Sequence, residues 1–113
     1  MAAYAELYLD QGTTFNNVIN LTDDMTNAYI NVAGYVVRSQ MRRSYFSANI
    51  SANIICTITD AANGEITMSM TAANTASLKA GRYLYDVEIV DTNGNVSRIL
   101  EGIISITPEI TKG

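Results

Sequence analysis

The chain has 113 residues and a formal net charge of −4, from seven basic and eleven acidic residues. This length fits one domain, residues 1–113, around a single core, and the charge excludes the basic stripe that nucleic-acid phosphates require. Hydrophobic residues make up 48% of the chain and charged residues 16%, which excludes an intrinsically disordered protein.

Seven short segments of alternating apolar and polar residues follow one another along the chain, as in half-buried strands. They cover residues 4–9, 15–21, 34–42, 54–58, 66–70, 83–89 and 96–106. Residues 25–31 are predicted to form a loop. About seven strands in a chain of this length predict an all-β sandwich.

Two Asn-Gly pairs mark hairpin turns in the second half of the chain. Asn63–Gly64 and Asn93–Gly94 supply the positive φ that a tight connection needs. The run Asp91-x-Asn93-x-Asn95 also resembles the first half of a calcium loop, but its glycine is at the fourth position instead of the sixth, and Gly102 takes the place of the final glutamate. We therefore expect a turn there and no metal site.

Two further glycines are predicted to have structural roles. The segment 71–80 is the only predicted helix, with Thr71 as its N-cap and Gly81 as a left-handed residue after its end. Gly102 interrupts the last strand where the apolar phase shifts, so we predict a β-bulge at Gly102.

The segment Leu78-x-x-Gly81-x-Tyr83-x-Tyr85 narrows the class of sandwich. In immunoglobulin-type domains a tyrosine after such a corner bonds back to the backbone, two residues before the second cysteine of the domain. Tyr83 matches that tyrosine, and Tyr85 takes the place of the cysteine. We therefore predict an immunoglobulin-like antiparallel β-sandwich of about seven strands, with one short helix before the last hairpin.

The residue types of a catalytic centre are scarce. The chain has no histidine, which is the usual general base and metal ligand. Its one cysteine, Cys56, alternates with Ile54 and Ile58, so we expect a small buried hydrophobe. No Gly-rich phosphate loop or zinc-spaced cluster occurs. We expect a protein that is not an enzyme and binds no cofactor.

Asp86 and Glu88 are the carboxylates best placed for acid–base catalysis, which needs a pair of acids. Their i, i+2 spacing puts both on one face of a strand. Cross-strand pairing with Arg38 and Arg42, or exposure to water, explains them without catalysis. We therefore expect a structural role.

The segment 41–46 is the best candidate for contact with a partner. Arginine and aromatic residues concentrate at interface hot spots, and here Arg42, Arg43, Tyr45 and Phe46 interrupt a polar connection. The alternative is a strand end whose aromatics fold back onto the core. A sheet edge that accepts another chain is a second route to partner contact.

Four stretches resemble a family of small phage and prophage structural proteins. They are LDQGTTF at 9–15, GYVVRSQMR at 34–42, ITDAANGEIT at 58–67, and GRYLYDV at 81–87 continuing with RILEGIISITPEIT at 98–111. The family is similar to immunoglobulin-like modules of phage tails, baseplates, fibre attachments and capsid decorations. The resemblance implies a virion component in several symmetric copies, with other virion proteins as partners and no catalytic residues.

The leading hypothesis is therefore a non-enzymatic structural component of the tail, baseplate or fibre attachment of a bacteriophage. The first residues lack a secretory signal and no apolar run approaches the roughly 20 residues that span a bilayer, so we expect assembly in the host cytoplasm without a membrane. One alternative is a capsid decoration (cement) protein of the phage head. Another is a carbohydrate- or host-surface-binding module, whose aromatic platform would be Tyr4 with Tyr8 or Tyr83 with Tyr85.

Overall fold

A computed structural model of the chain describes residues 3–23, 25–44, 52–108 and 110. Strands dominate it, so the predicted all-β class is confirmed. The elements are β1 (Ala3–Tyr4), β2 (Leu7–Asp10), β3 (Phe15–Asn20), β4 (Val36–Arg42), β5 (Ala52–Asp60), a 3₁₀ turn (Ala61–Asn63), β6 (Glu65–Met70), α1 (Ala72–Ala76), β7 (Gly81–Val90) and β8 (Val96–Thr107).

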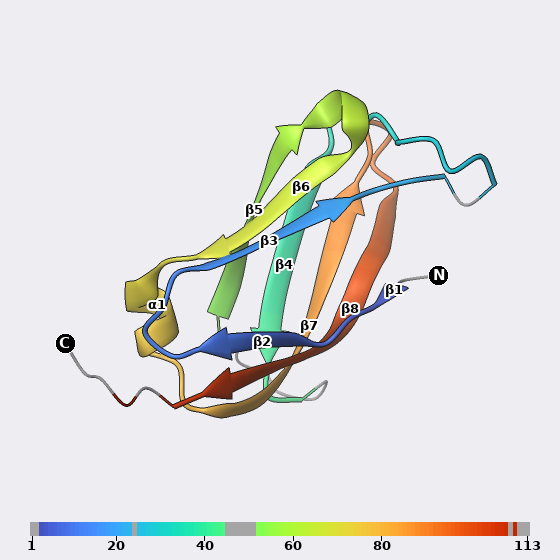
Figure 1. Cartoon of the computed structure of the whole chain (residues 1–113). Coiled ribbons are helices and arrows are strands. Elements are labelled where there is room, and N and C mark those ends of the chain that lie inside the picture. The colour runs from blue at the N-terminus through green and yellow to red at the C-terminus, as the bar shows by residue number, and fades with distance from the viewer. Residues whose placement is uncertain (1–2, 24, 45–51, 109, 111–113) are drawn as a thin grey trace.

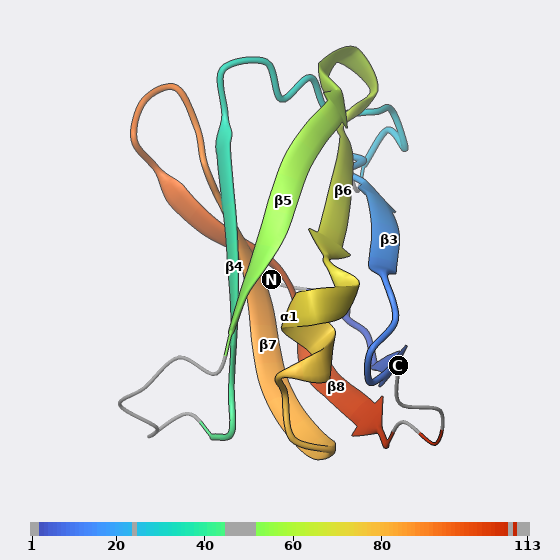
Figure 2. The same cartoon turned by 90° about the vertical axis from the view of Figure 1, so that its left-hand side faces the viewer.

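The strands form two packed layers that share β5 (Figure 1). One layer is the β4–β7–β8 sheet and the other is the β3–β6–β5 sheet, and Figure 2 shows β5 passing from one to the other. β5 pairs with β4 through Ala52–Ile54 and with β6 through Ile55–Asp60. This is the C–F–G and B–E–D arrangement of an immunoglobulin-like sandwich.

The first strand departs from the predicted antiparallel pairing. The segment 4–9 is divided into β1 and β2, and both pair with β8 in parallel. At the division, the Ala5 N–H donates to the Glu101 carbonyl oxygen (3.0 Å), and the Ala5 carbonyl oxygen accepts a hydrogen bond from the Tyr85 hydroxyl (2.8 Å). These contacts hold the first strand against the edge of β8.

Gly102 permits this close approach, and the bulge predicted at Gly102 is wrong. A Cβ atom at Gly102 would lie 2.0 Å from the Ala5 carbonyl oxygen. Gly102 pairs regularly with Tyr85, and the register between β7 and β8 shifts instead at Ile99, which has no partner on β7. The apolar phase does shift in this strand, but the extra residue lies three positions earlier.

The helix α1 is shorter than the predicted segment. Thr71 is its N-cap, as predicted, because its side chain accepts the Asn74 N–H at 3.2 Å. Four residues separate the helix from β7, so Gly81 is the first residue of that strand and not a helix C-cap. Thr75 is fully buried, and its hydroxyl donates to the Thr13 carbonyl oxygen at 2.7 Å. This bond ties the helix to the turn between β2 and β3.

Both predicted hairpin turns are confirmed. Gly64 has a φ of 63° after the 3₁₀ turn that joins β5 to β6. In the β7–β8 turn, Asp91 Oδ1 accepts the N–H groups of Asn93 and Asn95, each at 2.9 Å. These hydrogen bonds, led by that from Asn95, lower the pKa of the Asp91 carboxyl.

The core lies between the two sheets, where the inward side chains of both meet. Met68 and Ile104 have no exposed surface. Tyr83 is 4% exposed, and its hydroxyl donates to the Lys79 carbonyl oxygen at 2.7 Å. The predicted corner tyrosine is therefore confirmed. None of the helical segments in the described part of the chain has the length and apolar character to span a membrane.

Candidate functional site

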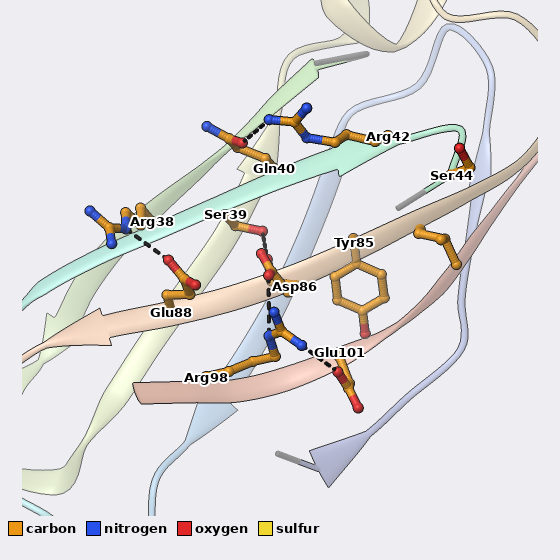
Figure 3. A pocket seen from close by; sticks show the side chains of 11 residues that line it. Arg38, Ser39, Gln40, Arg42, Ser44, Tyr85, Asp86, Glu88, Arg98 and Glu101 are labelled. Atoms are coloured by element: carbon orange, nitrogen blue, oxygen red, sulfur yellow. Dashed lines mark hydrogen bonds and ion pairs between the residues drawn. The ribbon is translucent and has the colours of Figure 1, made fainter. Parts of the chain in front are cut away.

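The outer face of the β4–β7–β8 sheet carries ion pairs around a hollow of about 440 Å³ (Figure 3). Arg38 Nε lies 2.9 Å from Glu88 Oε1. Arg98 contacts two carboxylates, with Nε 3.3 Å from Asp86 Oδ2 and Nη1 3.1 Å from Glu101 Oε2. Three arginines and three carboxylates line this hollow, so their charges balance within the chain.

The bulge at Ile99 places Arg98 on this face. Residues two apart in a regular strand lie on the same face. Without the extra residue, Arg98 would therefore point into the core like Leu100, which is buried. With it, Arg98 lies opposite Glu88 on the outer side. The bulge therefore supplies the cation that holds two carboxylates of the ladder.

Asp86 is the carboxyl whose environment this face changes most clearly. Burial raises its pKa, Glu88 raises it further, and the Arg98 guanidinium opposes both. The predicted pairing of this carboxylate pair with Arg38 is confirmed at Glu88, whereas Arg42 donates to Gln40 Oε1 at 3.2 Å. The arrangement is a cross-strand ladder of matched charges.

On the outer face of the β3–β6–β5 sheet, these strands carry two charged residues, Asp60 and Glu65, which are both acidic and lie opposite each other at one end. Its other members are small polar or β-branched: Asn16, Val18, Asn20, Ile55, Thr57, Thr59, Thr67 and Ser69. Val18 is 55% exposed and Ile55 is 50% exposed. We call the part of this surface away from Asp60 and Glu65 the neutral face. Val18 and Ile55 lie directly opposite Thr67 and Ser69, so their direct cross-strand partners are uncharged, and such a setting suits contact with protein.

β3 is also the edge strand of the neutral face. In an antiparallel ladder the N–H and C=O of alternate residues point to the same neighbour. Leu21 donates its N–H to the Gly64 carbonyl oxygen (3.0 Å) on the β6 side, so odd-numbered residues are directed at β6. The backbone groups of Asn16, Val18 and Asn20 therefore point to the other side, where no strand within the described ranges pairs with β3.

This edge has none of the usual protections. Exposed edge strands of soluble proteins normally carry lysine, proline or a bulge that blocks pairing with another chain. β3 reads FNNVIN, without charge or proline, and its register with β6 is regular. The lack of charge in this strand is visible in the sequence. The sequence does not predict that β3 is an edge strand, because this depends on the pairing of β1 and β2 with β8.

The predicted contact segment is only partly described. Arg42 lies beside the hollow of the β4–β7–β8 sheet. Arg43 stacks over the Tyr83 ring, with its guanidinium carbon 4.5 Å from the ring centroid. Tyr45 and Phe46 lie outside the described residues, so the segment stays a prediction.

The two predicted aromatic platforms differ sharply in exposure. Tyr83 and Tyr85 are each 4% exposed and face the core, so they form no platform. Tyr4 and Tyr8 are 61% and 71% exposed, and both hydroxyls approach the Glu6 carboxylate, at 3.4 and 3.1 Å. The first strand thus presents two aromatic rings around one carboxylate.

Cys56 packs partly buried against the core, close to the prediction of a small buried hydrophobe. Burial raises the pKa of its thiol to about 11, which leaves little thiolate at neutral pH. Among the residues that the structure places, no three His, Cys, Asp or Glu side chains gather where they could hold a metal ion.

No protein-family model matches this chain, and no curated protein matches it. Among solved structures, the chain is similar to CopC from Methylosinus trichosporium OB3b, with 10% identity and a TM-score of 0.43, over 68% of this chain and 67% of that one. It is also similar to an internalin-like protein of Listeria monocytogenes, with 16% identity and a TM-score of 0.46, over 94% of this chain and 28% of that one. Neither likeness bears on function.

Proposed function

We propose that this protein is a non-enzymatic structural component of a bacteriophage virion, an immunoglobulin-like module of the tail, baseplate or fibre attachment. It works through contacts with other virion proteins. The resemblance of four stretches of the sequence to phage structural proteins supports the assignment to a virion. The neutral face carries the assignment to protein contact.

The two outer faces differ in what they offer a partner. On the β4–β7–β8 sheet, Arg38 and Arg98 are already paired with carboxylates of the same chain. A partner that covered them would have to desolvate these pairs. The neutral face presents Val18 opposite Thr67 and Ile55 opposite Ser69, and the centres of protein interfaces are likewise depleted of charged residues.

Locating the protein in intact particles tests this proposal. Cryo-electron microscopy of phage particles, with the copy number measured, should show the module at the tail, with tens of copies or fewer. Hundreds of copies over the head would favour the alternative of a capsid decoration protein. Particles without the protein would refute a virion role.

A pair of matched variants tests which face makes the contact. Val18→Glu places a charge on the neutral face, and Val36→Glu places one at a side chain of similar exposure on the other sheet, 59% against 55%. Incorporation into particles should fall at least tenfold for Val18→Glu and stay unchanged for Val36→Glu. Equal incorporation of the two variants would refute the role of the neutral face.

A carbohydrate- or host-surface-binding module is the second candidate, favoured by the exposed pair Tyr4 and Tyr8. Aromatic rings offer a flat apolar surface to a sugar ring, and the Glu6 carboxylate between them can accept hydrogen bonds from hydroxyl groups. Glycan-array binding should then be lost in Tyr4→Ala and Tyr8→Ala and kept in Tyr29→Ala, whose side chain is 58% exposed elsewhere. No binding by the unaltered protein would exclude this candidate.

A further inference from the structure

We infer that the open edge of β3 pairs with β3 of a second copy of this chain, antiparallel about a twofold axis. The two β3–β6–β5 sheets would then form one continuous sheet of six strands. This pairing concerns the protein in solution and goes beyond a role in a virion. Each proposal can therefore fail without the other.

The direction of the backbone groups fixes the register. Asn16, Val18 and Asn20 point their N–H and C=O groups at the open edge, and their side chains lie on the outer face. Residues paired across two antiparallel strands lie on the same side of the sheet. Centring the axis on Val18 pairs Asn16 with Asn20 of the second copy and Val18 with itself, and each of these pairs can exchange two hydrogen bonds.

The neighbouring register is poorer. An axis through Asn17 would also keep the outer side chains together. It would leave the Asn20 backbone without a partner inside β3, because only Asn16 and Val18 would then face each other across the edge. The register centred on Val18 uses every open backbone group of the strand.

The side chains of β3 suit a copy of themselves. About Val18, the outer side of the strand reads Asn, Val, Asn, so an isologous contact sets valine against valine with an amide pair on either side. Each amide can donate to and accept from the other. β3 has no charge, so two chains of net charge −4 meet without like charges in contact. A twofold contact uses the same patch on both copies and therefore needs this self-complementarity. Pairing with an unrelated strand would not need it.

The pairing should be weak and depend on concentration. One strand edge buries less than the roughly 1,200 Å² at which stable interfaces begin. We therefore expect a dimer that forms between roughly 10 µM and 1 mM and dissociates on dilution.

Sedimentation equilibrium gives the first test. The unaltered protein should show reversible dimer formation in that range, and Val18→Lys should raise the dissociation constant at least tenfold. The 55% exposure of Val18 should let the variant fold, which circular dichroism checks. Val36→Lys is the matched control and should dimerise like the unaltered protein. A protein that stays monomeric up to 1 mM, or two lysine variants with equal dissociation constants, would overturn the pairing.

Disulfide trapping tests the register independently of affinity. In a Cys56→Ser background, Val18→Cys should form a linked dimer on mild oxidation, because paired Cα atoms about 5.5 Å apart are within disulfide reach. Val36→Cys is equally exposed on the other sheet and should link at least tenfold more slowly. Equal rates would refute the twofold pairing at Val18. A monomer that still enters particles would refute the dimer and leave the virion proposal intact.

Discussion

The two sheets of this sandwich end in different ways. The outer edge of β8 is covered by β1 and β2, which lie so close that Gly102 has no room for a side chain. The outer edge of β3 is uncovered in the described chain and carries no charge. Because both pieces of the first strand pair with β8, neither of them covers the edge of β3.

The outer faces repeat this contrast. The β4–β7–β8 sheet pairs its charges within the chain, through Arg38 and Arg98. The two faces differ in these ion pairs and not in exposed aliphatic side chains, because Val18 and Ile55 are exposed on the β3–β6–β5 sheet and Val36 and Val96 on the other. The uncovered edge of β3 is the basis for the proposed pairing with a second copy. The variants below test that difference.

Gly102→Ala should have the largest effect, because it acts on the covered edge. Its Cβ atom would meet the Ala5 carbonyl oxygen at 2.0 Å, so β1 and β2 must move away from β8. We expect the free energy of unfolding to fall by about 3 kcal/mol or more, as for other severe steric changes. Urea denaturation measures the loss.

Gly94→Ala is the matched control for that variant. Gly94 also has a positive φ, 85°, but nothing lies within 4 Å of the added Cβ. It should cost only the backbone strain, about 1 kcal/mol. Losses of equal size at Gly94 and Gly102 would mean that the first strand does not depend on the close approach.

Tyr85→Phe should have the next largest effect. It removes the hydroxyl that donates to the Ala5 carbonyl oxygen at 2.8 Å and leaves that acceptor without this donor. A loss of about 1–2 kcal/mol is expected in urea denaturation. Tyr8→Phe, at a side chain 71% exposed, should cost far less. If Tyr8→Phe costs as much, the bond to Ala5 does not hold the covered edge.

Much of the fold could be predicted because it depends on local signals. Alternation located the strands, and the Tyr83 hydroxyl bonds back to Lys79 as the corner motif predicts. The errors at Gly81 and Gly102 arose where the reason for a glycine lies outside its own segment. Gly102 is required by the close approach of Ala5, almost a hundred residues earlier. No local sequence pattern predicts such a contact.

The candidate site could also be predicted only where it depends on local alternation. The face shared by Asp86 and Glu88, and the pairing with Arg38, followed from strand alternation. The contribution of Arg98 did not, because the unpaired residue at Ile99 reverses the side on which it lies. The open β3 edge was likewise hidden, since edges depend on the partner of every other strand.

Arg98→Ala should have a modest effect, since it breaks pairs at an exposed surface. It removes contacts to Asp86 and Glu101 at 3.3 and 3.1 Å. Exposed ion pairs contribute about 0.2–1 kcal/mol and weaken with salt. The loss should therefore stay below about 1 kcal/mol and shrink in roughly 1 M NaCl. A large loss that salt does not change would mean that this face supports the core.

Asp86→Asn should have the smallest effect, and its sign depends on pH. Burial, and then Glu88, raises the pKa of Asp86 above its ordinary value of 3.8. The folded protein therefore holds the proton more tightly than the unfolded chain, and stability from this group is lost as pH rises through the folded pKa. The variant should match the unaltered protein below pH 3.8 and be slightly more stable at pH 7 in urea denaturation. A variant that is less stable at pH 7 would show that the Arg98 pair outweighs burial.

Amide hydrogen exchange at the edge of β3 tests most directly whether partners contact the neutral face and its edge. In dilute protein, the amides of Asn16, Val18 and Asn20 should exchange quickly, because they point away from β6. In the dimer or in assembled particles, these amides should be protected by at least about tenfold, as newly bonded backbone groups are. Fast exchange at these three amides in every assembled state, with new protection on the Arg38 and Arg98 side, would contradict the account.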